Sequence, residues 1–597
     1  MLLRQARLFF RQLPMGRRAL ALVWGVAPGW TTAWAVLLVA QGVIPAGQAL
    51  LLRTFVNRLV ATPGWVSVAP PALGIATLWM LGQLLSSALS WVRAVQAERV
   101  QDEVHRLIHI QALRLDMAFF DHPESYDQLY RAVVDALSQP MTLLESLGAL
   151  VQNGLGFLAL AAILFTYAGW LPFLLVVTGF PGLMLVARHI LRKHRWHLEN
   201  TLQQRRARYL DWLIADSDSA AELRLFDLGA HHRKAFEGIR EFLREGGLRL
   251  ERQGAVTELA AGSLAWAGSL LGLGWMLHRT LIGKAGLGDL LLCLQAFQQS
   301  QSLLRSILDG AGRIYRSLLF VENLDEFLGL NPQVVAGPIA GAGLPIKESI
   351  RLEDVSFTYP GGSRRALDAF NMEIPQGKVV ALVGHNGAGK STLIKLLCRF
   401  YDPDEGRILL DGVDMRQFDP VALRQQITVL FQDPVHYHAT VRENIAFGDL
   451  SGISDQSRVR RAAENAGVLD TVDRLPEGFE SILGKWFGGT ELSGGEWQAV
   501  ALARAFFRQS SLVILDEPTS DMDSWKEQEW LARFRSLTRG RTGLMITHRF
   551  TTAMHADMIH VLDQGRIVES GTHAELVAMG GTYATSWAAQ MREIGHA

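Results

Sequence analysis

The stretch Gly384-His385-Asn386-Gly387-Ala388-Gly389-Lys390-Ser391 decides how the second half of this chain folds. It fits G-x-x-x-x-G-K-[ST], the loop that binds the phosphates of a nucleotide. The apolar run 379–383 leads into the loop, and Lys390-Ser391-Thr392-Leu393 opens a helical pattern. A loop between a strand and a helix lets backbone N–H groups and the helix N-terminus converge on phosphate oxygens. The pattern therefore predicts a P-loop, with Lys390 on the β- and γ-phosphates and Ser391 on Mg²⁺.

Three further motifs follow the P-loop in order. Leu492-Ser493-Gly494-Gly495-Glu496 comes first, then the apolar run 512–515 that ends in Asp516-Glu517, and finally His548. A carboxylate at the end of a buried strand can hold Mg²⁺, and an adjacent carboxylate can polarise an attacking water. A P-loop pattern alone is shared by many NTPases. The four motifs in this order resemble the nucleotide-binding domain of an ABC (ATP-binding cassette) ATPase.

The resemblance implies a role for single residues outside the P-loop. It implies that Asp516 holds Mg²⁺, that Glu517 is the catalytic carboxylate and that His548 contacts the γ-phosphate. Gln432, in Phe431-Gln432-Asp433, resembles the Q-loop glutamine that reaches the metal. Tyr359, upstream of the P-loop, resembles the aromatic residue that stacks on adenine.

The implied cofactors are ATP and Mg²⁺. The implied metal ligands are Ser391, Gln432 and Asp516. The P-loop residues expected to bind nucleotide are Gly384, His385, Asn386, Gly387, Ala388, Gly389, Lys390, Ser391 and Thr392.

The segment 492–496, called the signature segment below, determines the quaternary prediction. In the family it opens a helix and binds the γ-phosphate held by the partner's P-loop, so the resemblance implies that Ser493, Gly494 and Gly495 act across a dimer. The usual fifth residue is Gln, and here it is Glu496. Serine and the glycines carry the phosphate contact, so the site is expected to be competent. One cassette per chain implies a half-transporter; a homodimer is favoured, and a heterodimer stays open.

The composition separates this chain from ordinary soluble proteins. Of its 597 residues, 49% are hydrophobic and only 19% are charged, which suggests several domains and a membrane. The formal net charge of +0 argues against a nucleic-acid partner. Cys293 and Cys398 form neither a metal motif nor a disulfide framework. The basic N-terminus lacks a signal-peptide pattern and is expected to lie in the cytosol.

Long uncharged stretches occur only before about residue 320. A membrane helix needs about 20 apolar residues. Two Arg-rich connections, 93–145 and 188–258, are predicted to lie in the cytosol under the positive-inside rule. The last predicted span is the weakest, because Lys284 and Asp289 lie near its start. The six predicted membrane helices cover about 19–52, 66–92, 146–167, 170–190, 256–278 and 281–304.

The predicted domains follow from these stretches. A six-helix, all-α transmembrane domain covers 1–320, a Gly- and Pro-rich linker covers 321–347, and an α/β nucleotide-binding domain covers 348–597. In this last domain short apolar runs alternate with helical patterns, which predicts a largely parallel sheet. The expected strands are 350–357, 379–383, 427–430, 512–515, 543–547 and 558–562.

Six spans followed by one cassette are similar to the type I ABC exporter (type IV in the newer fold naming). The resemblance implies ATP-driven export by an alternating-access dimer, with short coupling helices docked on the cassettes. The segment 119–126 resembles the first of these, and 221–226 lies near the second, unless both are plain amphipathic surface. The sixth span either lines part of a central cavity or emerges into the cytosol, since it carries Gln295, Gln298, Gln299, Ser300, Gln301 and Ser302.

The sequence restricts the chemical class of the substrate only loosely. Few charges lie deep in the predicted spans, which favours a hydrophobic or amphipathic substrate (peptide, lipid or drug-like) over a proton-coupled carrier. The stretch 483–491 lacks the Gly-Glu-Arg-Gly element of many drug and lipid exporters. With 495–498 and 437–444 it resembles the group that includes lantibiotic exporters. We expect no N-terminal peptidase domain before the first span, so that any leader peptide would be cut by another protein. The stretch 520–523 resembles the D-loop of the family, and in it Asp521 replaces a usual Ala, which leaves the cross-talk between ATP sites in question.

Other classes of function have less support in the sequence. A soluble ABC ATPase of translation or DNA repair conflicts with the six spans, and a role without turnover conflicts with Glu517 and His548. An exporter-fold protein that works in uptake or as a channel-like regulator stays open. The expected location is a bacterial plasma (inner) membrane, multi-pass, with the N-terminus and cassette in the cytosol. The expected contacts are membrane lipid, the transported substrate and a second half-transporter, with no nucleic acid.

Overall fold

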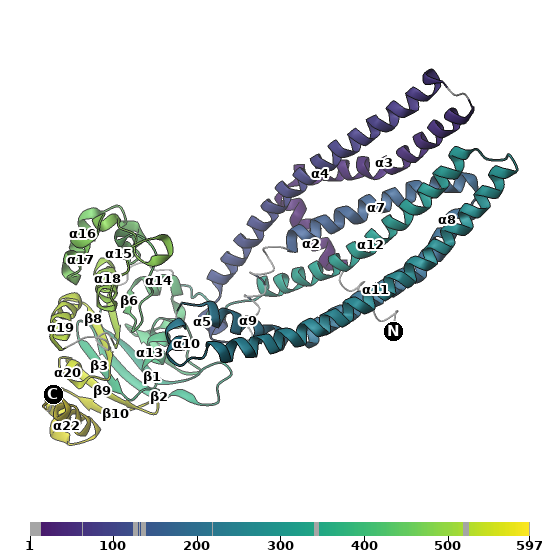
Figure 1. The fold of residues 1–597 in the computed structure, drawn as a ribbon. Coiled ribbons are helices and arrows are strands. Elements are labelled where there is room, and N and C mark those ends of the chain that lie inside the picture. Colours follow the sequence, from purple (N-terminus) through teal and green to yellow (C-terminus); the bar gives the residue numbers. More distant parts are fainter. Residues whose placement is uncertain are drawn as a thin grey trace. The chain divides into compact units, whose positions relative to one another are not determined.

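The computed structural model divides the chain into two compact units, of which the first is Met1–Ala112 with Gln128–Gly329 and the second is Leu113–Asp127 with Leu330–Ala597 (Figure 1). The described residues are 13–61, 64–122, 129, 132, 139–217, 219–339, 346–517 and 524–595.

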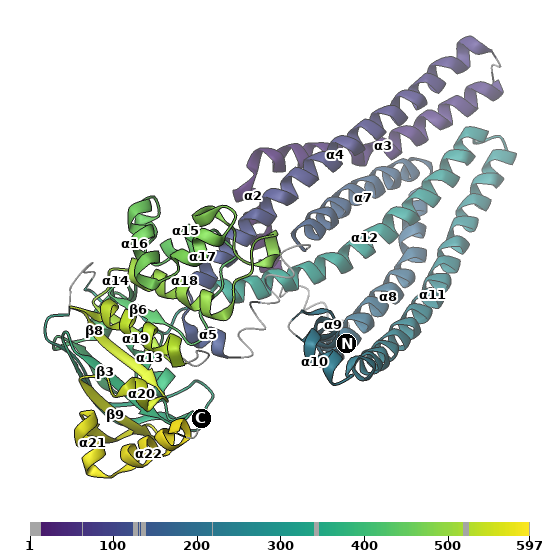
Figure 2. The same ribbon diagram turned by 60° about the vertical axis from the view of Figure 1, so that its left-hand side comes forward.

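The first unit is all helical. Helix α12 packs against α7 and α3, and α11 lies along α8 (Figure 2). Among the described residues, four helices, α3, α4, α7 and α11, are long and apolar enough to cross a membrane. The helices are α2 (Leu13–Val26), α3 (Pro28–Ala61), α4 (Trp65–Arg114), α7 (Gln139–Tyr167), α8 (Trp170–Glu199), α9 (Thr201–Ala215), α10 (Ala220–Leu225), α11 (Gly229–Leu281) and α12 (Leu287–Leu328).

Several helices depart from the predicted limits. The predicted span 19–52 is divided, because α2 ends at Val26 and α3 begins at Pro28. Proline has no N–H to donate to the preceding turn and disfavours the helical conformation of the residue before it, whereas it is well suited to open a helix. At the other end of the unit, α12 continues to Leu328, inside the predicted linker 321–347.

A buried charge lies near the start of α12. The Asp289 carboxylate accepts hydrogen bonds from Arg53 Nε, from the Tyr167 hydroxyl at 2.8 Å and from the Gly286 N–H at 2.8 Å. Arg53 belongs to α3 and Tyr167 ends α7. A buried carboxylate is tolerated only when it is paired and hydrogen-bonded. This one carboxylate therefore ties three helices together at the α12 end of the unit.

Replacing Asp289 with Ala is expected to destabilise this unit. The change leaves Arg53 and Tyr167 without their shared acceptor, at a cost of about 1–3 kcal/mol, since Arg53 is partly exposed. The midpoint of thermal unfolding, followed by tryptophan fluorescence in detergent, should fall by a few degrees. The matched control is Arg53→Ala, which should cost less and add nothing on top of Asp289→Ala. Full additivity of the two changes would contradict the pairing.

The second unit contains two sheets. The six-stranded sheet has the order β10 (Arg566–Gly571), β9 (Met558–Asp563), β3 (Val379–Gly384), β8 (Thr542–Thr547), β7 (Leu512–Asp516) and β6 (Ile427–Leu430). It is parallel except for the β10–β9 pair, so the predicted largely parallel sheet is confirmed. A separate antiparallel sheet, which was not predicted, has the order β2 (Arg365–Pro375), β1 (Ser349–Thr358), β4 (Glu405–Leu410) and β5 (Val413–Asp414).

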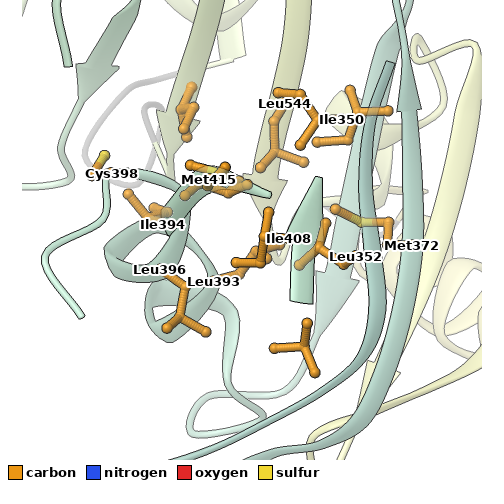
Figure 3. Close-up of a cluster of buried hydrophobic side chains, with 14 of the residues drawn as sticks. Ile350, Leu352, Met372, Leu393, Ile394, Leu396, Cys398, Ile408, Met415 and Leu544 are labelled. Atoms are coloured by element: carbon orange, nitrogen blue, oxygen red, sulfur yellow. The ribbon is translucent and has the colours of Figure 1, made fainter. Parts of the chain in front are cut away.

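The helix that follows the P-loop packs into the main core of this unit. Leu393, Ile394 and Leu396 of that helix belong to one buried cluster with Ile350, Leu352 and Ile408 of the antiparallel sheet, and Figure 3 shows Ile408 between Leu393 and Leu352. Each fully buried side chain of this size contributes about 1.5–3 kcal/mol. The P-loop helix is therefore held firmly between the two sheets. The helices of the second unit are α5 (Met117–Asp121), α13 (Lys390–Leu397), α14 (Pro420–Gln425), α15 (Val441–Ala446), α16 (Gln456–Ala466), α17 (Leu469–Arg474), α18 (Gly494–Phe507), α19 (Ser524–Thr538), α20 (Phe550–Ala553), α21 (His573–Met579) and α22 (Thr582–Gly595).

The short helix α5 belongs to this second unit. Ala118 of α5 is part of the main core, and Asp121 accepts hydrogen bonds from Lys395 Nζ at 3.0 Å and from the Tyr401 hydroxyl. Lys395 lies on α13, so α5 is anchored to the P-loop helix. The predicted coupling segment 119–126 begins here, and its residues 123–126 lie outside the described part of the chain.

Candidate nucleotide-binding and hydrolysis site

The carboxyl ends of four neighbouring parallel strands bring the predicted site residues together. The order β3, β8, β7, β6 places the P-loop after β3, His548 after β8, Asp516-Glu517 at the end of β7 and Gln432 just beyond β6. Ligands of open α/β sheets bind at this edge, where loops of adjacent strands converge. The sheet order therefore assembles residues that are far apart in the sequence.

The P-loop has the backbone that its glycines require. Gly387 and Gly389 have φ of +79° and +113°, in the left-handed region that side chains avoid. A Cβ on Gly389 would also lie 2.5 Å from the Ala366 carbonyl oxygen, and one on Gly384 would collide with the Leu562 carbonyl oxygen. Only glycine fits these positions, and the N-terminus of α13 is left open to receive phosphate oxygens.

Lys390 is buried inside the loop that it closes. Its Nζ donates to the Gly384 carbonyl at 2.7 Å and to the His385 carbonyl at 3.3 Å, and it lies 3.3 Å from Glu517 Oε1. Ser391, which follows, is exposed at the helix start, and Thr392 is buried. The ammonium group is thus positioned where a phosphate chain would cross the loop.

Glu517 lies between Lys390 and His548, the residue predicted to contact the γ-phosphate. Its Oε2 is 3.0 Å from His548 Nδ1, while Oε1 faces Lys390. The residue has φ of +47°, which is unusual for a side chain with a Cβ, and its N–H is fixed by the Ile546 carbonyl at 2.9 Å. Such strain is characteristic of functional positions. A carboxylate that is 12% exposed, beside a histidine and a lysine, is well placed to accept a proton from water.

Asp516 ends β7 as a buried carboxylate. Burial raises its pKa to about 6, with a further contribution from the adjacent Glu517 charge, while Lys390 opposes the shift. Negative charge is therefore in excess at this point, and a divalent cation would relieve it. Among the described residues no group of three or more His, Cys, Asp or Glu side chains could hold a metal ion on its own. The donor set here suits Mg²⁺, which takes few protein ligands and completes its shell with phosphates and waters.

Replacing Asp516 with Asn is expected to stabilise the nucleotide-free protein above pH 6. The folded pKa of Asp516 is raised above the unfolded value, so the contribution of this group to folding stability is fully present below about pH 4 and is lost as the pH rises through about 6. A shift of about two units corresponds to about 3 kcal/mol, which Asn removes. Chemical unfolding at pH 8 and at pH 4 measures this difference. Equal gains at both pH values would contradict the assignment.

Gln432 and Tyr359 lie at the rim of the site. Gln432 is exposed. The Tyr359 hydroxyl is 3.1 Å from Thr392 Oγ1, and Lys395 Nζ lies 5.0 Å from the centre of its ring. The aromatic ring is thus held beside the start of α13.

The signature segment is not joined to the P-loop. Ser493 is the N-cap of α18, and its side chain forms a capping box with Glu496. Gly494 and Gly495 are exposed. In the part of the chain that the structure describes, no hydrogen bond links these residues to the P-loop. The predicted D-loop residues 520–523 lie outside the described residues.

One residue near the site, Gln590, was not predicted from the sequence. Gln590 of α22 accepts a hydrogen bond from the Phe550 N–H at 2.8 Å, close behind His548, and the Phe550 ring packs edge-on against Tyr583. A cavity of about 780 Å³ separates α22 from Gly384, His385 and Asn386 of the P-loop. No local pattern marks Gln590, because its partner is distant in the sequence.

Comparisons with known proteins agree with this geometry. Residues 367–520 match the family described as ABC transporter. The chain is 32% identical over 596 residues to the ATP-dependent lipid A-core flippase of Cupriavidus metallidurans, with 96% of each chain covered. It is 28% identical to the subtilin transport ATP-binding protein SpaT of Bacillus subtilis, with 90% and 88% covered. A structure of a bacterial Atm1-family ABC exporter with ATP bound matches with a TM-score of 0.77 and 25% identity, over 95% of this chain and 99% of that one.

Proposed function

Since this chain belongs to the ABC transporter family, as an exporter half-transporter whose ATP hydrolysis drives transport, we propose the following assignment of its ATP site, its partner and its cargo. The observation that carries the assignment is the meeting of Lys390, Glu517 and His548 at the carboxyl edge of the parallel sheet.

Within one chain, each group has a defined task. The P-loop amides, from Gly384 to Ser391, hold the β- and γ-phosphates, and Lys390 neutralises them. Tyr359 stacks on the adenine. Glu517 orients the attacking water and accepts its proton, and His548 holds the Glu517 carboxylate in position.

The same edge accommodates Mg²⁺. When bound, the ion supplies positive charge that offsets the charge of the β- and γ-phosphates. Ser391, Gln432 and Asp516 are the residues that hold it. Asp516 is suited to the task because its buried charge otherwise lacks sufficient compensation.

We assign the partner as a second copy of the chain. Among the described residues, no hydrogen bond joins Ser493, Gly494 or Gly495 to the P-loop of their own chain, so we place their phosphate in the partner's P-loop. The helix α10 has no buried residue, and Leu225 and the following Phe226 are 77% and 62% exposed. A groove of about 290 Å³ on the second unit is lined in part by Phe431, Val435 and Tyr437. The exposed apolar residues Leu225 and Phe226 at the end of the partner's α10 fit such a groove.

The cargo is a large amphiphile, of lipid or peptide type. The relatives with this architecture are named for a lipid A-core flippase and for subtilin transport. The bacterial inner membrane is the proposed location, with the cassette in the cytosol. An uptake carrier and one half of a heterodimer are the second candidates.

Reconstitution tests the assignment. The purified chain in proteoliposomes, with cassettes facing outward, receives Mg²⁺-ATP and either a fluorescent glycolipid or a lanthionine peptide. We expect ATP-dependent transfer of one of them away from the cassette side. An inert chain that still binds ATP would indicate a heterodimer, and transfer toward the cassette side would indicate uptake.

A further inference from the structure

The signature segment carries a negative charge at the point where it should receive a phosphate. Glu496 occupies the third position of α18, where its Oε2 accepts hydrogen bonds from the Ser493 N–H at 2.9 Å and from the Ser493 hydroxyl at 2.8 Å. The pKa of Glu496 is lowered, chiefly by the backbone bond from Ser493, with burial opposing the shift. The group is therefore a carboxylate at neutral pH.

This carboxylate conflicts with phosphate binding by the same helix end. The N-terminus of a helix attracts anions through its open N–H groups and its dipole. Glu496 takes up part of this attraction, and two like charges 4 Å apart repel by about 1 kcal/mol even in water. An uncompensated Glu496 would weaken the attraction of α18 for the partner's γ-phosphate.

A cation from a different helix compensates the charge. Arg474, the last residue of α17, donates from Nη2 to Glu496 Oε1 at 2.7 Å and to Thr471 Oγ1 at 3.2 Å. Thr471 also donates to Glu496 Oε1, at 3.3 Å. The Arg474 side chain is 65% exposed and that of Glu496 is 30% exposed. Among the described residues, Arg474 is the one cation in an ion pair with Glu496.

We propose that Arg474 is a positioning residue of the composite ATP site, which neutralises Glu496 so that the signature segment can bind the γ-phosphate of the partner's nucleotide. When Glu496 is paired with Arg474, the two side chains together carry no net charge. An uncharged glutamine at position 496 would give the same local charge without a partner. The inference rests on the proposed dimeric ATPase and adds to it a residue outside every nucleotide-binding motif.

A four-member cycle tests the proposal: the wild type, Arg474→Ala, Glu496→Gln and the double variant, each in lipid nanodiscs. Arg474→Ala should raise the KM for ATP about two- to fivefold, as expected for a partly exposed charge pair, with a smaller change in kcat. In the Glu496→Gln background the same change should alter KM less than twofold. Arg474→Lys should recover part of the loss, and the effect should shrink as salt is added.

A purely structural role for Arg474 predicts a different result. If Arg474 only fixes α17 against α18, its removal should raise KM equally in both backgrounds and independently of salt, and this outcome would overturn the proposal. Thermal unfolding of the four proteins shows whether any of them is misfolded. A wild type that does not hydrolyse ATP would instead count against the proposed function, so the two failures are separable.

Discussion

Replacing Glu517 with Gln should lower the rate of ATP hydrolysis by about 10²–10⁴-fold while ATP binding is retained. Glutamine keeps the size of the side chain and can still contact His548 and Lys390, which lie 3.0 and 3.3 Å from the two carboxylate oxygens. What it cannot do is accept the proton of the attacking water. Phosphate release by the chain in nanodiscs measures the rate, and fluorescent ATP measures the affinity.

The control for this change is His548→Ala. It removes the group that holds the carboxylate and leaves the carboxylate itself, so its activity should lie between those of the wild type and Glu517→Gln. Glu517→Gln should also accumulate the ATP-bound dimer, which size-exclusion chromatography of the cross-linked protein detects. Substantial hydrolysis by the glutamine variant would show that Glu517 is not the catalytic base, and Asp516 would be the next candidate.

Replacing Lys390 with Ala should weaken ATP binding by about 10²-fold or more. The change removes a buried ammonium whose charge-assisted hydrogen bonds to phosphate have no substitute in the loop. Hydrolysis should be lost as a consequence of binding. Equilibrium titration with fluorescent ATP measures the affinity directly.

Lys378→Ala is the matched control for this loss. Lys378 precedes β3 in the same unit, and its exposed side chain pairs with Asp557 at 3.1 Å. Its removal changes the net charge by the same amount and should leave ATP affinity within about twofold of the wild type. Equal losses in the two variants would mean that general electrostatics, and not the P-loop, controls binding.

The sequence predicts the P-loop and six strands of the cassette, β1, β3, β6, β7, β8 and β9, because their determinants are local. A glycine pattern between an apolar run and a helical pattern requires no tertiary information. Of the antiparallel sheet only β1 was predicted, as 350–357. β2 was missed although it carries a pattern that indicates a strand: Leu367, Phe370, Met372 and Ile374 are buried, and their neighbours are partly or fully exposed. Such alternation is typical of a sheet with one covered face.

Other features depend on the folded chain. Asp121 reaches Tyr401 and Lys395, and Gln590 reaches Phe550, only because the fold brings remote segments together. The pairing of Asp289 with Arg53 belongs to the same class, and the sequence showed only that Asp289 weakened a predicted span. A proline alone does not predict the division at Pro28, because Pro45 lies inside α3 without ending it.

Lys390 has three partners within its own chain, the Gly384 and His385 carbonyls and the Glu517 carboxylate. Phosphate oxygens of ATP compete with these groups for the ammonium. The affinity is therefore a difference between two sets of contacts, and it is smaller than the new contacts alone would give. A lower affinity makes the fraction of loaded cassettes more responsive to the ATP concentration of the cell, so transport would slow as the energy supply falls.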